Sequence, residues 1–424
     1  MKLGTCPVCT EELDGNYEKK ELILIKKGEK FDCYQCGSEL FLDLIKERPR
    51  LGSEKAIILK YPTLTMGLEI ESFSIDLNKM KFVSMAPIYP KDGIEREEEF
   101  KKDMTIGSEF NSPVFTSLNE AFFRLKTALR KYFVNLETDE NMRIALIGSY
   151  DYENETAGVH YHFAFNKVKG ITIEQAKHIS PLIHQHIPFI IAITANSPII
   201  RKKMTKIASN RLLNNGMAMF SPLTREDLEE IELTNHFNEI NFAKGTEKKP
   251  STLEIRVVDS TIPEYIMAGL FIAYISILGA IKGKKPWKYF KFSRHEKDRI
   301  NAARRGVKAE IHWNKAKWVI PKYIDAFFNY YRTEVKESNI NRDILNVFRL
   351  AKSWWNAADI VRESYRIIEN RYKNKGQDFI NQEFCRKLLE AQRRNLDGDN
   401  LISFARHLNV KIPSIENVKL GKYF

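Results

Sequence analysis

The stretch MGLEIESFSID, residues 66–76, alternates apolar and polar side chains as a β-strand does, and it places Glu69 and Glu71 two positions apart. Side chains two apart on a strand point to the same face of the sheet. The two carboxylates therefore lie close together, and like charges so close repel each other unless a cation lies between them. For this segment alone the alternative is a solvated strand face, on which paired acids keep an edge soluble.

The same spacing of ionisable groups returns in two other strand-like segments. AGVHYHFAF places His160 and His162 on one strand face, and STLEIRVVDS does so with Glu254 and Arg256. IGSEFNSPVF adds Glu109 just before a Ser-Pro turn. One such pair could be a surface accident, but three in otherwise apolar surroundings favour a shared site.

Charges flanked by Ile, Leu, Val and Phe must be neutralised, because desolvating an unpaired carboxylate is costly. Mg²⁺ or Mn²⁺ would do so, since hard cations prefer carboxylate oxygens and keep open positions for phosphate oxygens. Two alternatives stay open: a surface ion pair between Glu254 and Arg256, and zinc at the His-x-His pair, although the surplus of carboxylates favours the harder metals. The sequence thus predicts two or three such ions around a nucleotide, held by Glu69, Glu71, Glu109 and Glu254 with one imidazole.

Composition indicates a folded protein with an anionic partner. The 424 residues exceed what one ordinary core supports, so we expect a large catalytic-sized domain and at least one smaller module. Lys and Arg number 67 against 55 acids, a net charge of +12, which favours a nucleotide, a polyanion or an acidic substrate.

We identify no apolar run that approaches the roughly 18–20 residues needed to cross a bilayer, and the start MKLGTCPVC lacks the apolar stretch of a secretion signal. We therefore expect a cytoplasmic protein with no membrane partner.

Four of the five cysteines lie in the first 36 residues, as the Cys-x-x-Cys pairs Cys6/Cys9 and Cys33/Cys36. Two such pairs supply four thiolates to one tetrahedral Zn²⁺, and a cytoplasmic location argues against disulfides. The 23 residues between the pairs leave room for a hairpin such as ELILIKKGEKFDC, residues 21–33. We predict a structural zinc site here and, in the helical stretch NQEFCRKLLEAQ, a packed and inert Cys385 thiol.

The N-terminal sequence resembles a zinc ribbon. CPVC followed by FDCYQCGSEL is similar in particular to the small amino-group carrier protein of archaeal and bacterial lysine biosynthesis. That carrier ends in an acidic tail with a terminal glutamate, whereas this chain continues through LIKERPRLGSEK into another domain. The resemblance therefore implies a docking or stabilising role rather than a carrier role.

The pattern of elements predicts an α+β protein. Residues 46–56 resemble a linker, and strand-like runs alternate with helical patterns from 57 to about 260, which favours an antiparallel sheet with helices on its outer side. We expect a zinc ribbon over 1–45, a catalytic domain over 57–320 and a helical region over 321–424 that packs on the catalytic domain. The expected strands are 64–76, 143–150, 158–166 and 252–258; the expected helices are 116–134, 173–195, 263–282, 295–306, 321–335, 342–373, 378–394 and 398–408.

Six blocks, in order along the chain, resemble the motif series of the glutamate-cysteine ligase type 2 or carboxylate-amine ligase family, within the glutamine synthetase-like superfamily. They are GLEIESFSID, SEFNSPVF, AGVHYHFAF, IAITANSPI, TLEIRVVD and INAARRGVKAEIHW. The resemblance spans roughly residues 64–315 and rests on the order and spacing of the blocks. It implies a catalytic sheet of the glutamine synthetase type.

The resemblance also implies metal ligands. By position in the motifs, Glu69, Glu71 and Glu109 would bind divalent cations, and His160 would bind the ion that bridges the phosphates. Glu254 corresponds to the last metal-binding acid of the family.

The remaining implied roles concern nucleotide and substrate. His162 would lie close to the nucleotide, and Arg256 would meet the phosphate being transferred. Asn196 corresponds to a substrate-side residue and Arg211 to an arginine near the substrate carboxylate, while Arg304 is a candidate for the same pocket and for nucleotide contact.

The activity implied by the resemblance is ATP-dependent amide formation. ATP phosphorylates a carboxylate, most simply that of glutamate, and an amine such as cysteine displaces phosphate from the acyl phosphate, leaving ADP. The sequence departs from the family in two places. The segment NETAGVHYHF lacks the glycine-rich, cysteine-containing stretch that usually precedes the histidines, and it has the bulky Tyr161; the loop after ANSP is also altered. These departures leave the identities of the acid and the amine open.

Other functions fit parts of the sequence. In KGKKPWKYFKFSRHEKDR, residues 282–299, basic residues interleave with aromatic ones, which could track phosphates and stack on bases; the alternative is a helix end and loop with its aromatics turned into the core. A ligase that docks a carrier protein or an RNA through its ribbon, a nucleic-acid-binding protein and a catalytically inactive partner protein are thus further hypotheses. We expect a homo-oligomer.

Overall fold

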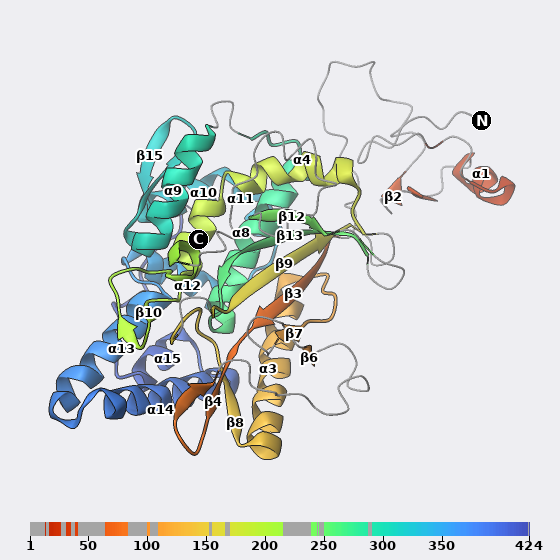
Figure 1. Cartoon of the computed structure of the whole chain (residues 1–424). Coiled ribbons are helices and arrows are strands. Elements are labelled where there is room, and N and C mark those ends of the chain that lie inside the picture. Colours follow the sequence, from red (N-terminus) through yellow and green to blue (C-terminus); the bar gives the residue numbers. More distant parts are fainter. Residues whose placement is uncertain are drawn as a thin grey trace.

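The computed structural model of the chain describes residues 13, 17–26, 31–34, 39–40, 64–83, 100–101, 109–151, 155–165, 170–214, 239–243, 245, 250–286, 291–422 and 424. Within these residues the main feature is a six-stranded antiparallel sheet (Figure 1). Its strands follow the order β12 (Ile240–Ala243), β13 (Thr252–Asp259), β9 (Gly158–Ala164), β3 (Thr65–Glu71), β7 (Glu109–Asn111) and β6 (Phe100–Lys101). The predicted α+β architecture with an antiparallel sheet is confirmed.

The two central strands have one apolar and one polar face. On β3, Met66, Leu68 and Ile70 are buried, and on β9 Val159 and Phe163 are fully buried on the same side. The residues between them carry the glutamates and histidines of the sequence motifs. This period of two therefore separates a dry face from a charged one.

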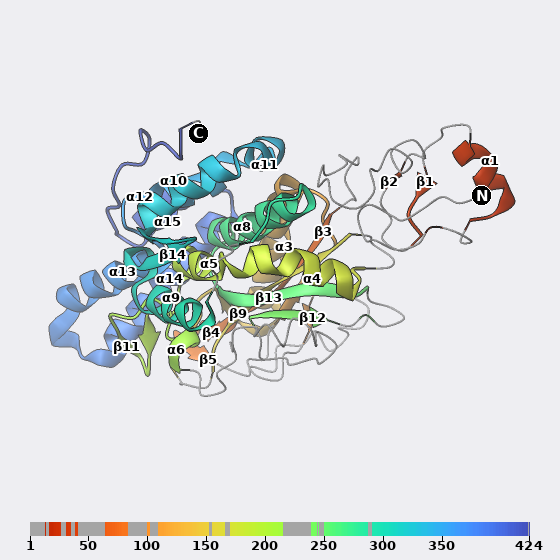
Figure 2. The same cartoon turned by 90° about the horizontal axis from the view of Figure 1, so that it is seen from above.

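Helices cover the apolar face. Figure 2 shows α4 (Ile173–His184), α5 (Ile187–Thr194) and α8 (Pro263–Ile281) on one side of β9 and β13. Every residue of α5 is buried, as is nearly every residue of α8. The expected helix 173–195 is thus two helices, because the chain turns at residues 185–186 before a proline at the start of α5.

Our expectation about apolar runs was wrong for α8. This helix of 19 residues is long and apolar enough to cross a membrane by length and composition, yet 89% of its most apolar window is buried inside the structure. A core helix surrounded by packed side chains has the same composition as a membrane span. Burial on all sides against the sheet and the neighbouring helices accounts for its sequence.

Tyr161 belongs to the apolar face. Its hydroxyl donates a hydrogen bond of 2.6 Å to the carbonyl of Ile266 in α8. A Cβ atom at Gly269, one turn on, would lie 2.4 Å from the tyrosine oxygen, so the glycine leaves the space that the large side chain fills. The bulky residue between the two histidines therefore does not narrow the polar face.

A second sheet and several short elements complete the sheet region. β4 (Phe73–Asp76) pairs with β5 (Lys81–Val83) and β8 (Met142–Ala145). Ser117 caps α3 (Leu118–Glu140), since its hydroxyl accepts from the N–H of Glu120 at 3.2 Å. The short elements are β10 (Ile199–Ile200), β11 (Lys203–Met204), α6 (Arg211–Asn214), η1 (Gly306–Lys308), β14 (Glu310–Trp313) and β15 (Ala316–Val319).

The C-terminal part is helical and packs on the sheet region. Gln392 binds the backbone N–H and C=O of Leu146 with its side-chain amide. Lys126 of α3 and Asn395 both bind the buried carboxylate of Glu264 in α8, so three distant segments share one buried charge. The helices are α9 (Phe292–Arg305), α10 (Ile320–Tyr330), α11 (Arg332–Glu337), α12 (Arg342–Lys352), α13 (Ala357–Tyr372), η2 (Lys373–Lys375), α14 (Gln377–Leu396) and α15 (Leu401–His407).

The thiol of Cys385 in α14 matches its prediction. It is buried, and burial raises its pKa to about 12. Such a thiol stays protonated at neutral pH and is a poor nucleophile.

The N-terminal segment departs from the hairpin predicted over 21–33. Residues Lys19–Lys26 form α1, in which Ile25 is buried, and the side chain of Glu21 accepts from the backbone N–H of Glu18 at the start of the helix. The hairpin comes later, as β1 (Phe31–Asp32) and β2 (Glu39–Leu40). Cys33 is buried, while the other three predicted zinc ligands, Cys6, Cys9 and Cys36, lie outside the described residues.

His186 provides a test of the core. It is fully buried, its ring nitrogens lie 2.8 Å from the Tyr323 hydroxyl and 3.0 Å from that of Tyr331, and burial lowers its pKa from 6.5 to about 3. The unfolded chain therefore binds a proton below about pH 6.5 that the folded chain refuses, so stability is lost as the pH falls. Between pH 8 and pH 5 we expect this group to remove about 2 kcal/mol of the free energy of unfolding.

Urea unfolding of the wild type and of His186→Gln at both pH values measures this. The variant is less stable at pH 8 but should show a pH dependence flatter by that amount. Equal slopes in the two proteins would contradict the assignment.

Candidate active site

The sheet register brings the predicted acids and histidines onto one face. Glu69 on β3 pairs with His160 on β9 and, on its other side, with Asn111 on β7. Two residues farther along β3, Glu71 pairs with Glu109; two residues in the other direction, His162 on β9 pairs with Glu254. These residues come from segments up to 185 positions apart in the sequence, and only the sheet makes them neighbours.

His160 lies at the centre of this group. Its Nδ1 is 3.4 Å from Glu69 Oε2 and 3.3 Å from Glu254 Oε1, and its Nε2 is 3.6 Å from Glu71 Oε1. His162 Nε2 is 3.3 Å from Glu69 Oε2, and its Nδ1 is 2.9 Å from the hydroxyl of Thr252. We call Glu69, Glu71, Glu109, His160, His162 and Glu254 the carboxylate cluster.

The carboxylates of the cluster have unequal electrostatic environments. Burial raises the pKa of Glu69, but the hydrogen bonds and charges of His160 and His162 outweigh it and hold that pKa far below its usual range. Burial lowers the pKa of His160, but Glu69 and two further carboxylates raise it overall. For Glu109, burial and the charge of Glu69 together raise the pKa to about 7. The same surface thus carries an ionised acid, Glu69, a histidine that favours its charged form, His160, and an acid whose pKa is near 7, Glu109.

A β-bulge places Arg256 beside the cluster. The register of β13 against β9 shifts between Ile255 and Val258, so that two residues, of which Arg256 is the first, lie opposite His160. An extra residue in one strand bends it and re-aims its side chains. The Nε atom of Arg256 lies 3.7 Å from Glu254 Oε1, and the side chain keeps about a fifth of its surface exposed. A cation is thus held next to the acids with room for a further contact.

Glu71 is anchored by the backbone. Its Oε2 accepts a 2.6 Å hydrogen bond from the N–H of Gly158, and its C=O accepts one of 2.7 Å from the hydroxyl of Ser260. Its other carboxylate oxygen faces His160. The carboxylate is therefore fixed in orientation before any ligand binds.

Arg211 lies behind the bulge. Its guanidinium donates to the carbonyls of Arg256 at 3.1 Å and Val258 at 3.2 Å, and it lies 3.8 Å from Asp259 Oδ1. A Cβ atom at Gly158 would lie 2.1 Å from this guanidinium, so any larger residue there would displace the guanidinium from these carbonyls. These contacts make Arg211 a support for β13; its role as a clamp for a substrate carboxylate stays a prediction.

Asn196 belongs to a buried polar network at the end of β13. Its backbone N–H donates to Asp259 Oδ2 at 2.8 Å, and its side-chain amide donates to the carbonyl of Ser260 at 2.9 Å. Asp259 also accepts from the hydroxyls of Ser197 and Ser209. The ANSP block is thus a buried turn tied to the sheet, and the substrate-side role of Asn196 stays a prediction.

Arg304 is an exposed residue in the last turn of α9, and its backbone carbonyl accepts from the N–H of Ala208. That bond joins α9 to the segment that carries Arg211. The described contacts of Arg304 include none between its side chain and the carboxylate cluster. Its predicted role in the substrate pocket and in nucleotide contact stays a prediction.

Sequence reasoning missed two asparagines on the same face. Asn111 Nδ2 donates to Glu109 Oε1 at 2.8 Å, and Asn241 Nδ2 lies 3.4 Å from Glu254 Oε2. A signal was present for Asn111, because EFN at 109–111 repeats the spacing of two seen in the other motifs, whereas the place of Asn241 beside Glu254 follows only from the pairing of β12 with β13. Each amide orients a carboxylate at one end of the cluster.

The basic stretch 282–299 is partly engaged within the molecule. Lys282 forms an ion pair with Glu337, and the ammonium group of Lys284 lies 4.6 Å from the centre of the Tyr330 ring. Residues 287–290, with most of the aromatics of this stretch, lie outside the described residues. Nucleic-acid binding here stays a hypothesis.

The cluster can hold a divalent cation. Glu69, His162 and Glu254 each offer a ligand atom within 4.8 Å of the others. Glu71 and Glu109 add carboxylate oxygens beside this triad. The donor set is rich in oxygen with imidazole at its edge, which fits Mg²⁺ or Mn²⁺ and leaves the acids neutralised.

Solved structures share this fold. The chain resembles a bifunctional glutathione synthetase from Pasteurella multocida, with a TM-score of 0.53 and 11% identity over 82% of this chain and 55% of that chain. A glutamate-cysteine ligase resembles the chain in fold as well. The enzyme of that name from Francisella tularensis, solved with AMP, matches with a TM-score of 0.51 and 10% identity over 82% of this chain and 97% of that one.

The ligase PafA, solved in complex with the prokaryotic ubiquitin-like protein Pup, matches with a TM-score of 0.51 and 9% identity over 84% of this chain and 80% of that one. No protein-family model matches the sequence, and no curated protein matches it. The chain spans about half the length of the bifunctional synthetase. At such identities the likeness shows the fold, and it agrees with the motif resemblance to the carboxylate-amine ligases.

Glu109 provides a test of the repulsion between the carboxylates of the cluster. Its pKa of about 7 against 4.5 in an unfolded chain means that its ionised form destabilises the folded protein increasingly as the pH rises from 4.5 to 7. In a chelator at pH 8, Glu109→Gln should therefore raise the free energy of unfolding, by on the order of 2–3 kcal/mol, with no gain at pH 4.5. Urea unfolding at both pH values checks this.

The control is Glu120→Gln at the start of α3, which replaces an acid outside the cluster. A gain that is the same at both pH values, or one shared by the control, would show that Glu109 is not strained by its neighbours.

Proposed function

We propose that this protein is an ATP-dependent carboxylate-amine ligase, which activates a carboxylate as an acyl phosphate and joins it to an amine. The observation that carries the proposal is the carboxylate cluster with Arg256 beside it. Four carboxylates on one buried face suit the binding of cations, and cations with an arginine are what a nucleotide's terminal phosphates require. The shared fold of the glutamate-cysteine ligases supports the same reaction class.

The motif resemblance assigns divalent cations to Glu69, Glu71, Glu109, His160 and Glu254 and places His162 toward the nucleotide. In the structure it is His162 whose ligand atom lies within 4.8 Å of those of Glu69 and Glu254, with His160 beside them, so we expect either imidazole to contact an ion. When bound, Mg²⁺ or Mn²⁺ would neutralise phosphate oxygens and favour attack at the γ-phosphorus. The protein's own part is to fix the acids in advance. Gly158 does this for Glu71, Asn111 for Glu109 and Asn241 for Glu254.

Arg256 would stabilise the phosphoryl group in transfer. Its guanidinium is anchored on one side by Glu254 and remains partly exposed on the other. Charge develops on the equatorial oxygens of the transferring group, and a preorganised cation beside them lowers the barrier. The β-bulge and the support of Arg211 hold this cation in place.

The identities of acid and amine are open parts of the proposal. Glutamate is the simplest acid, and cysteine or another amine the acceptor. The likeness to a ligase solved with its protein partner supports a second version, in which one substrate is carried on a macromolecule and the predicted zinc ribbon docks it. Exclusion of water from the acyl phosphate is required in either case.

The activity is tested by incubating the full chain with ATP, Mg²⁺ and pools of amino acids, amines or small carrier proteins. We expect ADP release that depends on both an acid and an amine, with an amide product found by mass spectrometry. Glu254→Gln should abolish this activity, whereas Glu310→Gln, which changes an exposed acid of the β14–β15 hairpin, should leave it intact. Formation of AMP in place of ADP would exclude the acyl-phosphate route.

Arg256→Lys tests the electrostatic part of the proposal. A lysine keeps the charge but not the planar guanidinium, so we expect kcat to fall about 10²–10³-fold with a much smaller change in the KM for ATP. Steady-state kinetics with ATP varied separates the two constants. A change in KM alone would place Arg256 in nucleotide binding and not in phosphoryl transfer.

A further inference from the structure

A second cluster of metal-ligating side chains lies among the helices, away from the polar face of the sheet. His184 ends α4, His295 lies in the first turns of α9, and Glu239 directly precedes β12. All three are buried, with exposed fractions of 4% or less. Nothing in the proposed ligase reaction uses them.

The ligand atoms converge on one carboxylate oxygen. Glu239 Oε2 lies 2.8 Å from His295 Nε2 and 3.4 Å from His184 Nε2, and the three atoms lie within 4.8 Å of one another. A tetrahedral ion with bonds of about 2.0–2.1 Å separates its ligands by about 3.3–3.4 Å. The contact to His184 already has this length, and the contact to His295 would have to open by about 0.5 Å to accept an ion.

The carboxylate is oriented by a further contact. Arg299, one turn along α9 from His295, places its Nε 3.1 Å from the other oxygen of Glu239. An outer partner of this kind fixes a ligating carboxylate and leaves its second oxygen for the metal. The backbone carbonyl of Glu239 also accepts the N–H of Arg256 at 3.1 Å, so this cluster is joined through one peptide group to the candidate active site.

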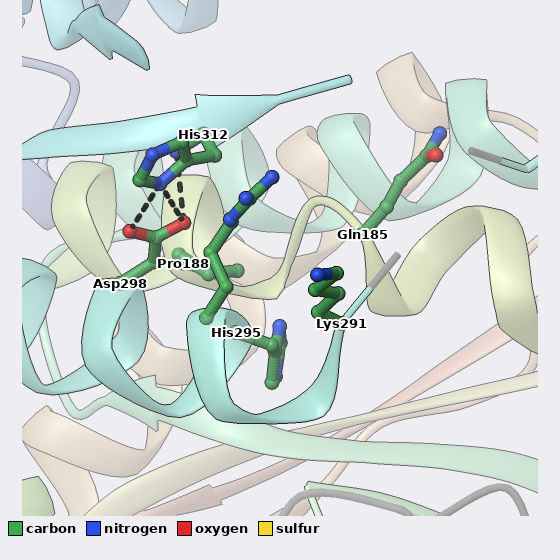
Figure 3. Close-up of a pocket in the computed structure, with 7 residues that line it drawn as sticks. Gln185, Pro188, Lys291, His295, Asp298 and His312 are labelled. Atoms are coloured by element: carbon green, nitrogen blue, oxygen red, sulfur yellow. Dashed lines mark hydrogen bonds and ion pairs between the residues drawn. The ribbon is translucent and has the colours of Figure 1, made fainter. Parts of the chain in front are cut away.

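A small pocket lies beside the cluster, on the side of His295. It is lined by His295 together with Lys291, Arg294 and Asp298 of the same helix region and by His312, which is paired with Asp298 (Figure 3). Lys291 and Arg294 would draw a small anion into this pocket. An anionic or hydroxide fourth ligand would offset the charge that a divalent ion adds next to Arg299.

We propose that His184, Glu239 and His295 form a binding site for a divalent transition metal of the Zn²⁺ type. Two imidazoles and one carboxylate suit such a metal better than Mg²⁺, which prefers oxygen ligands alone. The ion would tie α4 and α9 to the edge strand β12 and thereby fix the peptide that positions Arg256. The competing explanation is a metal-free network in which Glu239 is paired directly with His184, His295 and Arg299.

The metal content of the purified protein distinguishes the proposed metal site from the metal-free network. The full chain is purified without chelator and dialysed, and its zinc is counted by mass spectrometry against protein concentration. His184→Gln and His295→Gln should each lose about one equivalent relative to the wild type. His186→Gln, which alters a histidine two residues from His184 that is equally buried but bonded to tyrosines, should lose none. Equal zinc in all four proteins would overturn the proposal.

A second measurement does not depend on the variants' folding. Wild-type chain stripped of metal is titrated with Co²⁺, whose visible bands differ for thiolate ligands and for nitrogen and oxygen ligands. We expect a nitrogen-oxygen tetrahedral spectrum in addition to any thiolate spectrum from the predicted ribbon, and its displacement by one equivalent of Zn²⁺. Thiolate bands alone, or no binding, would overturn the proposal in favour of the metal-free network. Because this readout needs no turnover, its failure and that of the proposed ligase activity are independent.

Discussion

The crowding of carboxylates on one face of the sheet is the constraint that the rest of the structure has to satisfy. Two such charges about 4 Å apart repel by about 4 kcal/mol at an effective dielectric constant of 20. The opposite face offsets this, because each fully buried large apolar side chain contributes about 1.5–3 kcal/mol. Met66, Leu68, Ile70, Val159 and Phe163 belong to that dry layer and to the same hydrophobic core as the buried residues of α5 and α8. The apolar burial of α5 and α8 thus contributes stability that offsets the repulsion between the carboxylates on the polar face.

The position of the histidines on the central strand follows from the same constraint. β9 lies between β3 and β13, so one imidazole, that of His160, reaches acids on both sides. A histidine on an edge strand would reach only one. The pKa of Glu69, which faces both histidines, is held far below its usual range, and that of Glu109 rises to about 7. Environments that shift the pKa values of neighbouring groups in opposite directions are characteristic of catalytic sites and of sites that bind charged ligands.

Much of this arrangement could be predicted from the sequence, because strand periodicity is a local property. The spacing of Glu69 with Glu71 and of His160 with His162 fixes which side chains share a face, and the order of the six motifs indicated the fold. The neighbours across strands depend on register and bulges, which no local pattern encodes, and so the place of Asn241 beside Glu254 could not be predicted. The alternating run around Ile25 was misread for a related reason: a helix buries that residue as well as a strand would. The apolar composition of α8 was overlooked because only the packed structure distinguishes a core helix from a membrane span.

Arg211 has a structural task in addition to the substrate role predicted for it, which stays a prediction. The bulge in β13 removes regular ladder bonds just where Arg256 must be aimed, and carbonyls left without strand partners are costly when buried. One guanidinium supplies donors to two of those carbonyls, at Arg256 and Val258, in the space that Gly158 leaves open. A lysine has a single ammonium group and could not span both acceptors with fixed geometry. An arginine at this position is therefore explained by the shape of the strand that carries the proposed phosphate-binding cation, whether or not a substrate carboxylate also reaches it.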